Sequence, residues 1–331
     1  MMKKKLFACL LSAAMVLSLA ACGGTSETET TGTDDTGSEG QTYTIGVIQQ
    51  MQHVALDAAT EGFQDALTEL LGDQVNIDVQ NASGESANCS TIVGSFVSSG
   101  VDLIMANGTT ALQSAAAATT TIPILGTSIT EYGVALGIDG FTGTTGMNVS
   151  GTSDLAPLDQ QAAMLQEWFP DAKNVGLVYC SAEPNSLYQV ETVQGYLEEM
   201  GYTCTAYSFS DSNDLSAVAT NACAQSDVLY IPTDNTAAQN SELIGNIAQS
   251  SATPIIAGEE GICSGCGVAT LTISYYDIGY ATGEMAYEIL VNGADPAEME
   301  IQYAPQFTKK YNADMCDALG LTAPEGYEAI G

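Results

Sequence analysis

Asp227-Val-Leu-Tyr-Ile-Pro-Thr-Asp-Asn235 is the stretch that best indicates the fold of this chain. Residues 228–231 form a short apolar run of the β type, which stops at a proline followed by polar residues. A helical pattern comes next, and a second apolar run then ends in Gly258-Glu-Glu260. Strand, helix and strand in this order predict a βαβ unit of a parallel sheet. Because ligands bind at the carboxyl ends of such strands, we expect Asp234 and Glu259 on one rim.

The same alternation of apolar runs and helical patterns extends over most of the chain. Residues 132–150 are rich in Gly and Thr and interrupt this alternation, and we interpret them as the connection between two similar halves. We therefore predict an α/β protein with two Rossmann-like lobes, each an open parallel sheet, joined by a hinge. Further strands are expected at 44–48, 75–79, 101–106, 122–125, 174–179, 203–207 and 268–273.

The first residues of the chain have the pattern of an export signal. Three lysines precede an apolar run at 6–21, which is too short for a comfortable membrane span. The run ends in Leu19-Ala-Ala-Cys22, which resembles a bacterial lipobox. We predict a lipoprotein signal peptide at 1–21, a lipid on Cys22 and a flexible tether at 22–42. The alternative is an ordinary secretory signal with a chance cysteine.

Charge and motifs exclude several classes of function. The chain has 40 acidic and 6 basic residues, a formal net charge of −34 and no arginine. Nucleic acid is excluded as a partner, because neutralising phosphates needs clustered Lys or Arg. The sequence has no H-E-x-x-H, Walker loop or nucleophile elbow, so we predict no enzyme activity, no cofactor and no metal.

Several segments together resemble one family of transport proteins. With the lipobox and the acidic tether, they resemble the substrate-binding lipoproteins of bacterial ABC importers, which have the type I periplasmic-binding-protein fold. More narrowly, they resemble the subfamily associated with tryptophan and other aromatic amino acids, over residues 43–320. The segments are Ile45-Gly-Val-Ile-Gln49, His53-Val-Ala-Leu-Asp57, Gly151-Thr-Ser-Asp154 with Gln160 and Gln161, Ile231-Pro-Thr-Asp-Asn235, Ala257-Gly-Glu259, Ser274-Tyr-Tyr-Asp-Ile-Gly279 and Thr282-Gly-Glu-Met285.

The resemblance implies an organisation and a role. The hinge would have three crossings, with residues 43–153 and 275–300 in the first lobe and residues 154–274 and 301–331 in the second. The protein would be a monomer on the outer face of the cell membrane, serving permease subunits with a separate ATPase. Its ligand would be an amino acid, most simply an aromatic one such as tryptophan. Another amino acid, a small peptide or a nucleobase is the alternative.

A zwitterionic ligand needs an anion site and a cation site. Without arginine, its carboxylate would be held by hydroxyls and backbone N–H groups where strands turn into helices. Its ammonium group would be held by carboxylates, with Asn235 sharing the role. The carboxylate-binding candidates are Thr109, Thr110, Thr127 and Ser128, and the ammonium-binding candidates are Asp154, Asp234 and Glu259. The alternative for most of them is helix capping.

Two more groups of residues are expected to face the cleft. Those of the first lobe are Gln49, Met51, His53 and Asp57, and those of the second lobe are Glu183, Asn185 and Ser186. His53 is the only histidine, and a lone histidine is usually structural, although on this rim it can stack on or hydrogen-bond a ligand. Tyr275 and Tyr276 are expected at the hinge or in the wall of the cleft.

The pair Cys263-Ser-Gly-Cys266 departs from the subfamily pattern. It can form a local disulfide, half of a zinc site, a redox pair or two inert thiols. Zinc would need two further ligands that the surrounding sequence lacks, so a disulfide in the loop after Glu259, or inert thiols, is expected. A thiol–disulfide lipoprotein that uses this pair is the alternative function from a different class.

Overall fold

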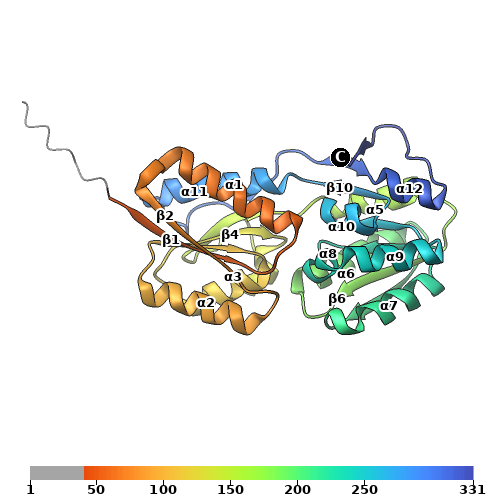
Figure 1. The fold of residues 1–331 in the computed structure, drawn as a ribbon, viewed down its shortest axis with the longest axis horizontal. Coiled ribbons are helices and arrows are strands. Elements are labelled where there is room, and N and C mark those ends of the chain that lie inside the picture. The colour runs from red at the N-terminus through yellow and green to blue at the C-terminus, as the bar shows by residue number, and fades with distance from the viewer. Residues whose placement is uncertain (1–40, 331) are drawn as a thin grey trace, which may run out of the picture. The chain divides into compact units, whose positions relative to one another are not determined.

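The structure is a computed structural model that describes residues 41–330. The predicted signal peptide, Cys22 and nearly all of the predicted tether lie outside this range. Within it, the chain forms two lobes, each built on one sheet with helices on both faces (Figure 1).

The first lobe has a sheet in the order β11-β5-β4-β3-β1-β2 within the described residues, and every pairing in it is parallel. Its central strands are buried along their whole length, as expected for apolar strands covered on both faces. Its strands are β1 (Tyr43–Gln49), β2 (Val75–Asn81), β3 (Leu103–Asn107), β4 (Ile124–Ile129), β5 (Val149–Ser153) and β11 (Gln302–Tyr303).

Helices cover both faces of this first sheet (Figure 1). One face is packed by α1 (Val54–Leu71) and α11 (Tyr275–Leu290), and the other by α2 (Ser86–Ser99) and α3 (Thr109–Ala118). The turn η1 (Gly72–Gln74) and the short helix α4 (Tyr132–Leu136) complete the lobe.

Two glycines allow α1 and α11 to lie against each other (Figure 1). A Cβ on Gly279 would collide with the carbonyl oxygen of Ala59, and one on Gly62 would collide with that of Tyr276. The backbones therefore approach more closely than any larger residue permits. This contact places α11, which follows the second lobe in sequence, in the first lobe.

The second lobe has a sheet in the order β13-β12-β10-β9-β8-β6-β7 over the described residues, in which only the pairing of β10 with β12 is antiparallel. Its strands are β6 (Asn174–Cys180), β7 (Thr203–Phe209), β8 (Val228–Ile231), β9 (Ile255–Ala257), β10 (Ala269–Thr272), β12 (Thr308–Tyr311) and β13 (Glu328–Ala329). One face is covered by α5 (Leu158–Trp168), α6 (Pro184–Glu199) and α12 (Ala313–Leu319). The other is covered by α7 (Ser212–Gln225), α8 (Asn235–Gln239), α9 (Ser241–Ser251) and α10 (Glu260–Cys266).

The chain crosses between the lobes three times, after β5, after β10 and after β11. The predicted α/β fold with two largely parallel sheets is therefore confirmed. The predicted lobe boundary at residue 300 needs correction, because Gln302 and Tyr303 pair with β5 in the first sheet. The third crossing lies between Tyr303 and Thr308, where the chain leaves this edge strand for the antiparallel strand of the other sheet.

Some local structure differs from the sequence prediction. The segment after Glu259, predicted as a loop, is the helix α10, because the Glu259 side chain caps its first turn. The passage at 132–150 contains the short helix α4, whose N-cap is Glu131. Both helices are too short to show a period in the sequence, and their caps stabilise them instead.

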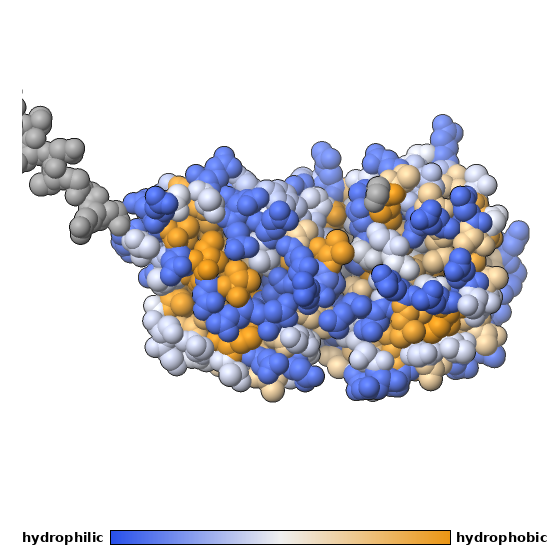
Figure 2. Space-filling model, viewed as in Figure 1, coloured by the Kyte–Doolittle hydropathy of each residue, from blue (hydrophilic) through white to orange (hydrophobic). Residues whose placement is uncertain are grey.

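None of the helices in residues 41–330 combines the length and the apolarity needed to cross a bilayer. Hydrophilic residues dominate the face of the molecule shown in Figure 2, and its apolar residues form separate patches.

Candidate ligand-binding site

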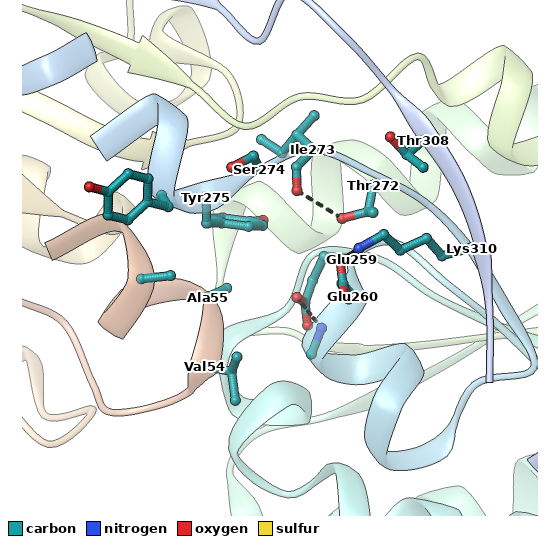
Figure 3. A pocket seen from close by; sticks show the side chains of 13 residues that line it. Val54, Ala55, Glu259, Glu260, Thr272, Ile273, Ser274, Tyr275, Thr308 and Lys310 are labelled. Atoms are coloured by element: carbon teal, nitrogen blue, oxygen red, sulfur yellow. Dashed lines mark hydrogen bonds and ion pairs between the residues drawn. The ribbon is translucent and has the colours of Figure 1, made fainter. Parts of the chain in front are cut away.

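Two cavities are lined by residues of both lobes. The first has a volume of 270 Å³ and lies between the first turn of α1 and the start of α10, beside the second crossing (Figure 3). Figure 3 shows Tyr275 projecting from that crossing into the space between α1 and Glu259. The second cavity has a volume of 310 Å³ and is lined by Met51 and Thr110 of the first lobe and by Glu183, among others, of the second.

His53 lies in the chain between residues that line the two cavities. Met51 lines the second cavity and Val54 lines the first. Its Nε2 forms a hydrogen bond of 3.1 Å with Oδ1 of Asn235, which belongs to the other lobe. The structure therefore brings these two predicted residues together across the interlobe space.

Gln49 and Asp57 have their hydrogen bonds within the first lobe. Gln49 Nε2 donates to Asp57 Oδ1 at 2.6 Å and to the Met51 carbonyl oxygen at 2.9 Å. Its Oε1 accepts from the Thr60 hydroxyl at 2.7 Å. Both polar atoms of the Gln49 amide thus have partners, and the amide holds the loop that carries Met51 against α1.

Thr127 and Ser128 face different environments at an irregular point of β4. The pairing register of β4 with β5 shifts between Gly126 and Ile129. Thr127 Oγ1 lies 3.0 Å from Thr152 Oγ1 inside the lobe. Ser128 has a φ of 55°, and its buried hydroxyl has no hydrogen-bond partner among residues 41–330. A bulge with a strained non-glycine residue is a common way to aim a side chain at a ligand.

Thr109 and Thr110 form the first turn of α3. Thr109 is buried, and Thr110 lines the second cavity. The Thr110 backbone N–H donates to Gln50 Oε1 at 2.9 Å, so this N–H is already satisfied by a residue that the sequence prediction did not include. Gln50 therefore fixes the end of β1 to the start of α3.

Asp154, Tyr275 and Glu259 form a cluster where the first two crossings meet. The Tyr275 hydroxyl donates to Asp154 Oδ2 at 3.0 Å, while Asp154 Oδ1 is buried without any partner in the described part of the chain. Burial raises the pKa of Asp154 to about 6, against the opposing effect of the Tyr275 hydroxyl. Burial also raises the pKa of Glu259 to about 7, and the Asp154 charge adds to this shift.

Glu259 also has a structural role, since its carboxylate accepts the backbone N–H of Gly261 at 2.6 Å and that of Ile262. Glu259 therefore caps the N-terminus of α10, as the alternative interpretation of the sequence proposed. Capping does not exclude ligand contact, because each carboxylate oxygen has two lone pairs and Glu259 lines the first cavity.

Asp234 and Glu183 both hold the start of α8. Asp234 accepts the backbone N–H of Cys180 at 2.6 Å and that of Ala237 at 2.8 Å. Glu183 accepts from the Asn235 backbone N–H at 3.0 Å, the Asn235 Nδ2 at 2.7 Å and the Thr236 hydroxyl at 2.7 Å. Burial, with the neighbouring Glu183 charge, raises the pKa of Asp234. Every oxygen of the two carboxylates accepts at least one hydrogen bond, so both side chains organise this rim.

Asn185 lies in the first turn of α6 with one side of its amide free. Its Nδ2 donates to the Thr233 carbonyl oxygen at 3.0 Å, and it lies 3.3 Å from the hydroxyl of the fully buried Ser186. Asn185 Oδ1 is buried and accepts no hydrogen bond from residues 41–330. An unpaired buried carbonyl is costly unless a ligand or another donor reaches it.

Some of the predicted residues have all their polar side-chain atoms hydrogen-bonded within the protein, and others have an atom without a partner in residues 41–330. Buried atoms without a partner in the described range occur on both rims. Among the predicted site residues, these atoms are His53 Nδ1, Ser128 Oγ, Asp154 Oδ1 and Asn185 Oδ1, while Asn107 Oδ1, Trp168 Nε1 and Thr270 Oγ1 are the others in residues 41–330. The oxygens of Asp154 and Asn185 can only accept, given the contacts of the other side-chain atoms, so this region is suited to a molecule that brings N–H or O–H donors.

The predicted disulfide between Cys263 and Cys266 is not formed. Both cysteines are free and buried on α10, and Cys266 Sγ contacts the Ile262 carbonyl oxygen within the helix. Burial raises the pKa of both thiols, which makes them poor nucleophiles. Residues 41–330 contain no group of three or more His, Cys, Asp or Glu side chains able to hold a metal ion. The geometry therefore matches inert core thiols.

Two wall residues were absent from the sequence prediction. Lys310 and Glu260 line the first cavity and form an ion pair of 2.7 Å. Lys310 belongs to β12, whose antiparallel pairing with β10 brings it beside the second crossing. That strand had no clear signal in the sequence.

Comparisons with known proteins agree on one family. Residues 44–328 match the family described as ABC transporter substrate binding protein. A tyrosine-binding protein of Clostridioides difficile (strain R20291) is 33% identical over 280 residues, which cover 84% of this chain and 81% of that protein.

Two solved structures share both fold and sequence with the chain. An ABC domain from Streptococcus pneumoniae in complex with L-Trp has a TM-score of 0.83 and 31% identity, covering 88% of this chain and 100% of that one. A ligand-free, open substrate-binding protein with adhesive properties from Clostridium difficile has a TM-score of 0.67 and 34% identity, covering 87% and 99%. The arrangement of this chain is thus more similar to that of the L-Trp complex.

Proposed function

The chain belongs to the family of ABC transporter substrate-binding proteins, and we propose that it captures an aromatic amino acid between its two lobes. The observation that carries this proposal is the set of buried acceptors with no partner in residues 41–330, above all Asp154 Oδ1 and Asn185 Oδ1. A ligand ammonium group would supply the donor missing at Asp154, and another N–H or O–H group of the ligand would supply the one missing at Asn185. A ligand without donors would leave both oxygens unsatisfied.

The ammonium group is assigned to the cluster of Asp154 and Glu259. Both carboxyls are buried and have raised pKa values, so each lacks a compensating charge in the protein alone. A bound cation would stabilise their ionised forms. Asp234, which the sequence prediction placed in this role, supports it indirectly by holding α8 in place.

The carboxylate group of the ligand is assigned to Ser128. Its hydroxyl is unpartnered within the described residues, and the bulge leaves part of the local backbone outside the regular β4–β5 pairing. Thr109 and Thr110 at the start of α3 are the second choice, because a helix N-terminus favours an anion.

The aromatic side chain is assigned to the apolar wall of the first cavity. Val54 and Ala55 of α1 line it together with Ile273 and Tyr275 (Figure 3). The 270 Å³ volume is close to the smaller end of ordinary small-molecule pockets, which are about 300–1,000 Å³. The relatives named for tyrosine and solved with L-Trp favour an aromatic ligand over other amino acids, small peptides and nucleobases.

The protein would act outside the cytoplasm as the capture component of an importer. We propose a monomer anchored by a lipid on Cys22, with permease subunits and a separate ATPase as partners and no catalytic step of its own. A Cys22→Ala variant should lose the lipid and leave the membrane fraction. Retention of this variant on the membrane would refute the anchor and leave ligand capture untouched.

Titration calorimetry against the twenty amino acids tests the ligand. We expect binding of L-Trp, L-Tyr or L-Phe, and loss of binding in Asp154→Asn. Asp159→Asn is the matched control, since Asp159 is an exposed residue of α5 only five positions away. No binding of any amino acid by protein freed of carried-over ligand would refute the proposal.

A further inference from the structure

The orientation of the Asn235 amide is fixed by Glu183. The Asn235 Nδ2 donates to Glu183 Oε2 at 2.7 Å, and its backbone N–H donates to the same oxygen at 3.0 Å. A carboxylate only accepts, so the nitrogen of the amide must be the atom that faces it. The other atom, Oδ1, therefore faces His53.

This arrangement decides which nitrogen of His53 carries the proton. Asn235 Oδ1 can only accept, so the His53 Nε2 at 3.1 Å must be the donor. Burial lowers the pKa of His53, and the charges of Glu183 and Asp57 oppose this effect without reversing it. The ring is therefore neutral at physiological pH, with its proton on Nε2 and a bare lone pair on Nδ1.

The Nδ1 atom is buried and has no hydrogen-bond partner within residues 41–330. His53 lies in the chain between a residue that lines one interlobe cavity and a residue that lines the other. Because the same ring bonds to the other lobe through Nε2, its bare Nδ1 can accept a hydrogen bond from a group that enters the interlobe space.

We propose that His53 Nδ1 accepts a hydrogen bond from an N–H or O–H group of the bound amino acid, and that Glu183 and Asn235 set the tautomer that makes this possible. The proposal rests on the proposed function. It makes Glu183 and Asn235 positioning residues, which act through His53.

The single histidine of the chain makes the test unambiguous. The experiment is ¹⁵N NMR of the imidazole in the purified chain without a histidine tag, before and after addition of L-Tyr or L-Trp. We expect the neutral tautomer with the proton on Nε2 in the free protein, and an upfield shift of the Nδ1 signal on binding. A proton on Nδ1, or an Nδ1 signal that binding leaves unchanged, would overturn the proposal.

The donor is identified by comparing ligands with the wild type and with His53→Phe. If the ligand side chain donates, the substitution weakens L-Tyr binding by roughly tenfold and leaves L-Phe binding unchanged. If the ammonium donates, it weakens L-Tyr and L-Phe equally and spares 3-(4-hydroxyphenyl)propionate. Equal effects on all three probes, or none, would count against an acceptor role.

Glu183→Gln tests the positioning step. A glutamine can donate as well as accept, so the Asn235 amide is free to turn over, and we expect a mixture of His53 tautomers in the NMR spectrum with the fold retained. An unchanged tautomer would refute the role of Glu183. If the protein binds no amino acid at all, the proposed function is refuted. The His53 tautomer in the free protein tests the roles of Glu183 and Asn235 independently of binding.

Discussion

Lowering the pH should weaken amino-acid binding, although the ligand keeps its zwitterionic form. The reason is that Asp154 has a pKa of about 6 and Glu259 a pKa of about 7 in the protein without ligand. A ligand ammonium group pairs with the ionised carboxylates. Below these pKa values, each carboxyl must lose its proton before the pair can form, and affinity falls.

The expected size follows from the two pKa values. At a pH of about 5, a group with a pKa of about 6 is ionised in about one molecule in eleven, which costs about tenfold in affinity. A group with a pKa of about 7 is ionised in about one molecule in a hundred. We therefore expect a loss of about tenfold if Asp154 alone contacts the ammonium, and a much larger loss if Glu259 does so as well.

Titration calorimetry from neutral pH to about pH 5 measures this loss, and uptake or release of protons can be read from buffers with different ionisation enthalpies. Asp159→Asn should reproduce the wild-type profile, since Asp159 is exposed. A dissociation constant that does not change over this range, with proton release near zero, would refute the assignment of the ammonium to these carboxyls.

Three further predictions concern other parts of the molecule. Ser128→Ala should weaken binding roughly tenfold by calorimetry, and normal affinity in this variant would exclude a role for the hydroxyl. Ser128→Gly should raise the free energy of unfolding by about 1 kcal/mol, because it removes the cost of a positive φ. Gly279→Ala should lower the free energy of unfolding, measured by denaturant unfolding, by about 2 kcal/mol or more, because a Cβ there collides with α1. As a control, Gly94→Ala should stabilise the protein, because Gly94 lies in a helix with open space around it. Replacing Cys263 and Cys266 by alanine should leave amino-acid affinity unchanged, and the native thiols should resist alkylation until the protein unfolds; loss of binding would revive the thiol-based alternative.

The two-lobed fold could be predicted from the sequence because its signals are local and repeated. Apolar runs such as β8 are buried on both faces and keep their character along the chain. The third crossing was harder to place, since β11 has only two residues and pairs with a strand about 150 positions earlier. A short edge strand has too little pattern to distinguish it from a loop.

The sequence was enough to predict which strand ends carry the site residues, but not which hydrogen bonds those residues form. Asp234 and Glu259 do lie at the carboxyl ends of neighbouring strands, and both also cap the helices that follow. A sequence does not reveal which lone pairs remain free. The same limit applies to Thr127, whose hydroxyl contacts Thr152 inside the lobe at the point where the β4–β5 register shifts.

The lack of arginine is consistent with the absence, among the residues that the structure describes, of a basic partner for the buried carboxyls of the site. Within residues 41–330, Lys309 pairs with Glu167 at 2.8 Å and Lys310 pairs with Glu260 at 2.7 Å. Neither lysine compensates Asp154 or Glu259, whose raised pKa values record the cost of burying two nearby carboxyls. A built-in cation would remove that cost and would also occupy the place of a ligand ammonium. Leaving the carboxyls uncompensated makes the free protein less stable as pH rises through about 6 to 7, and it lets a cationic ligand recover that stability when it binds.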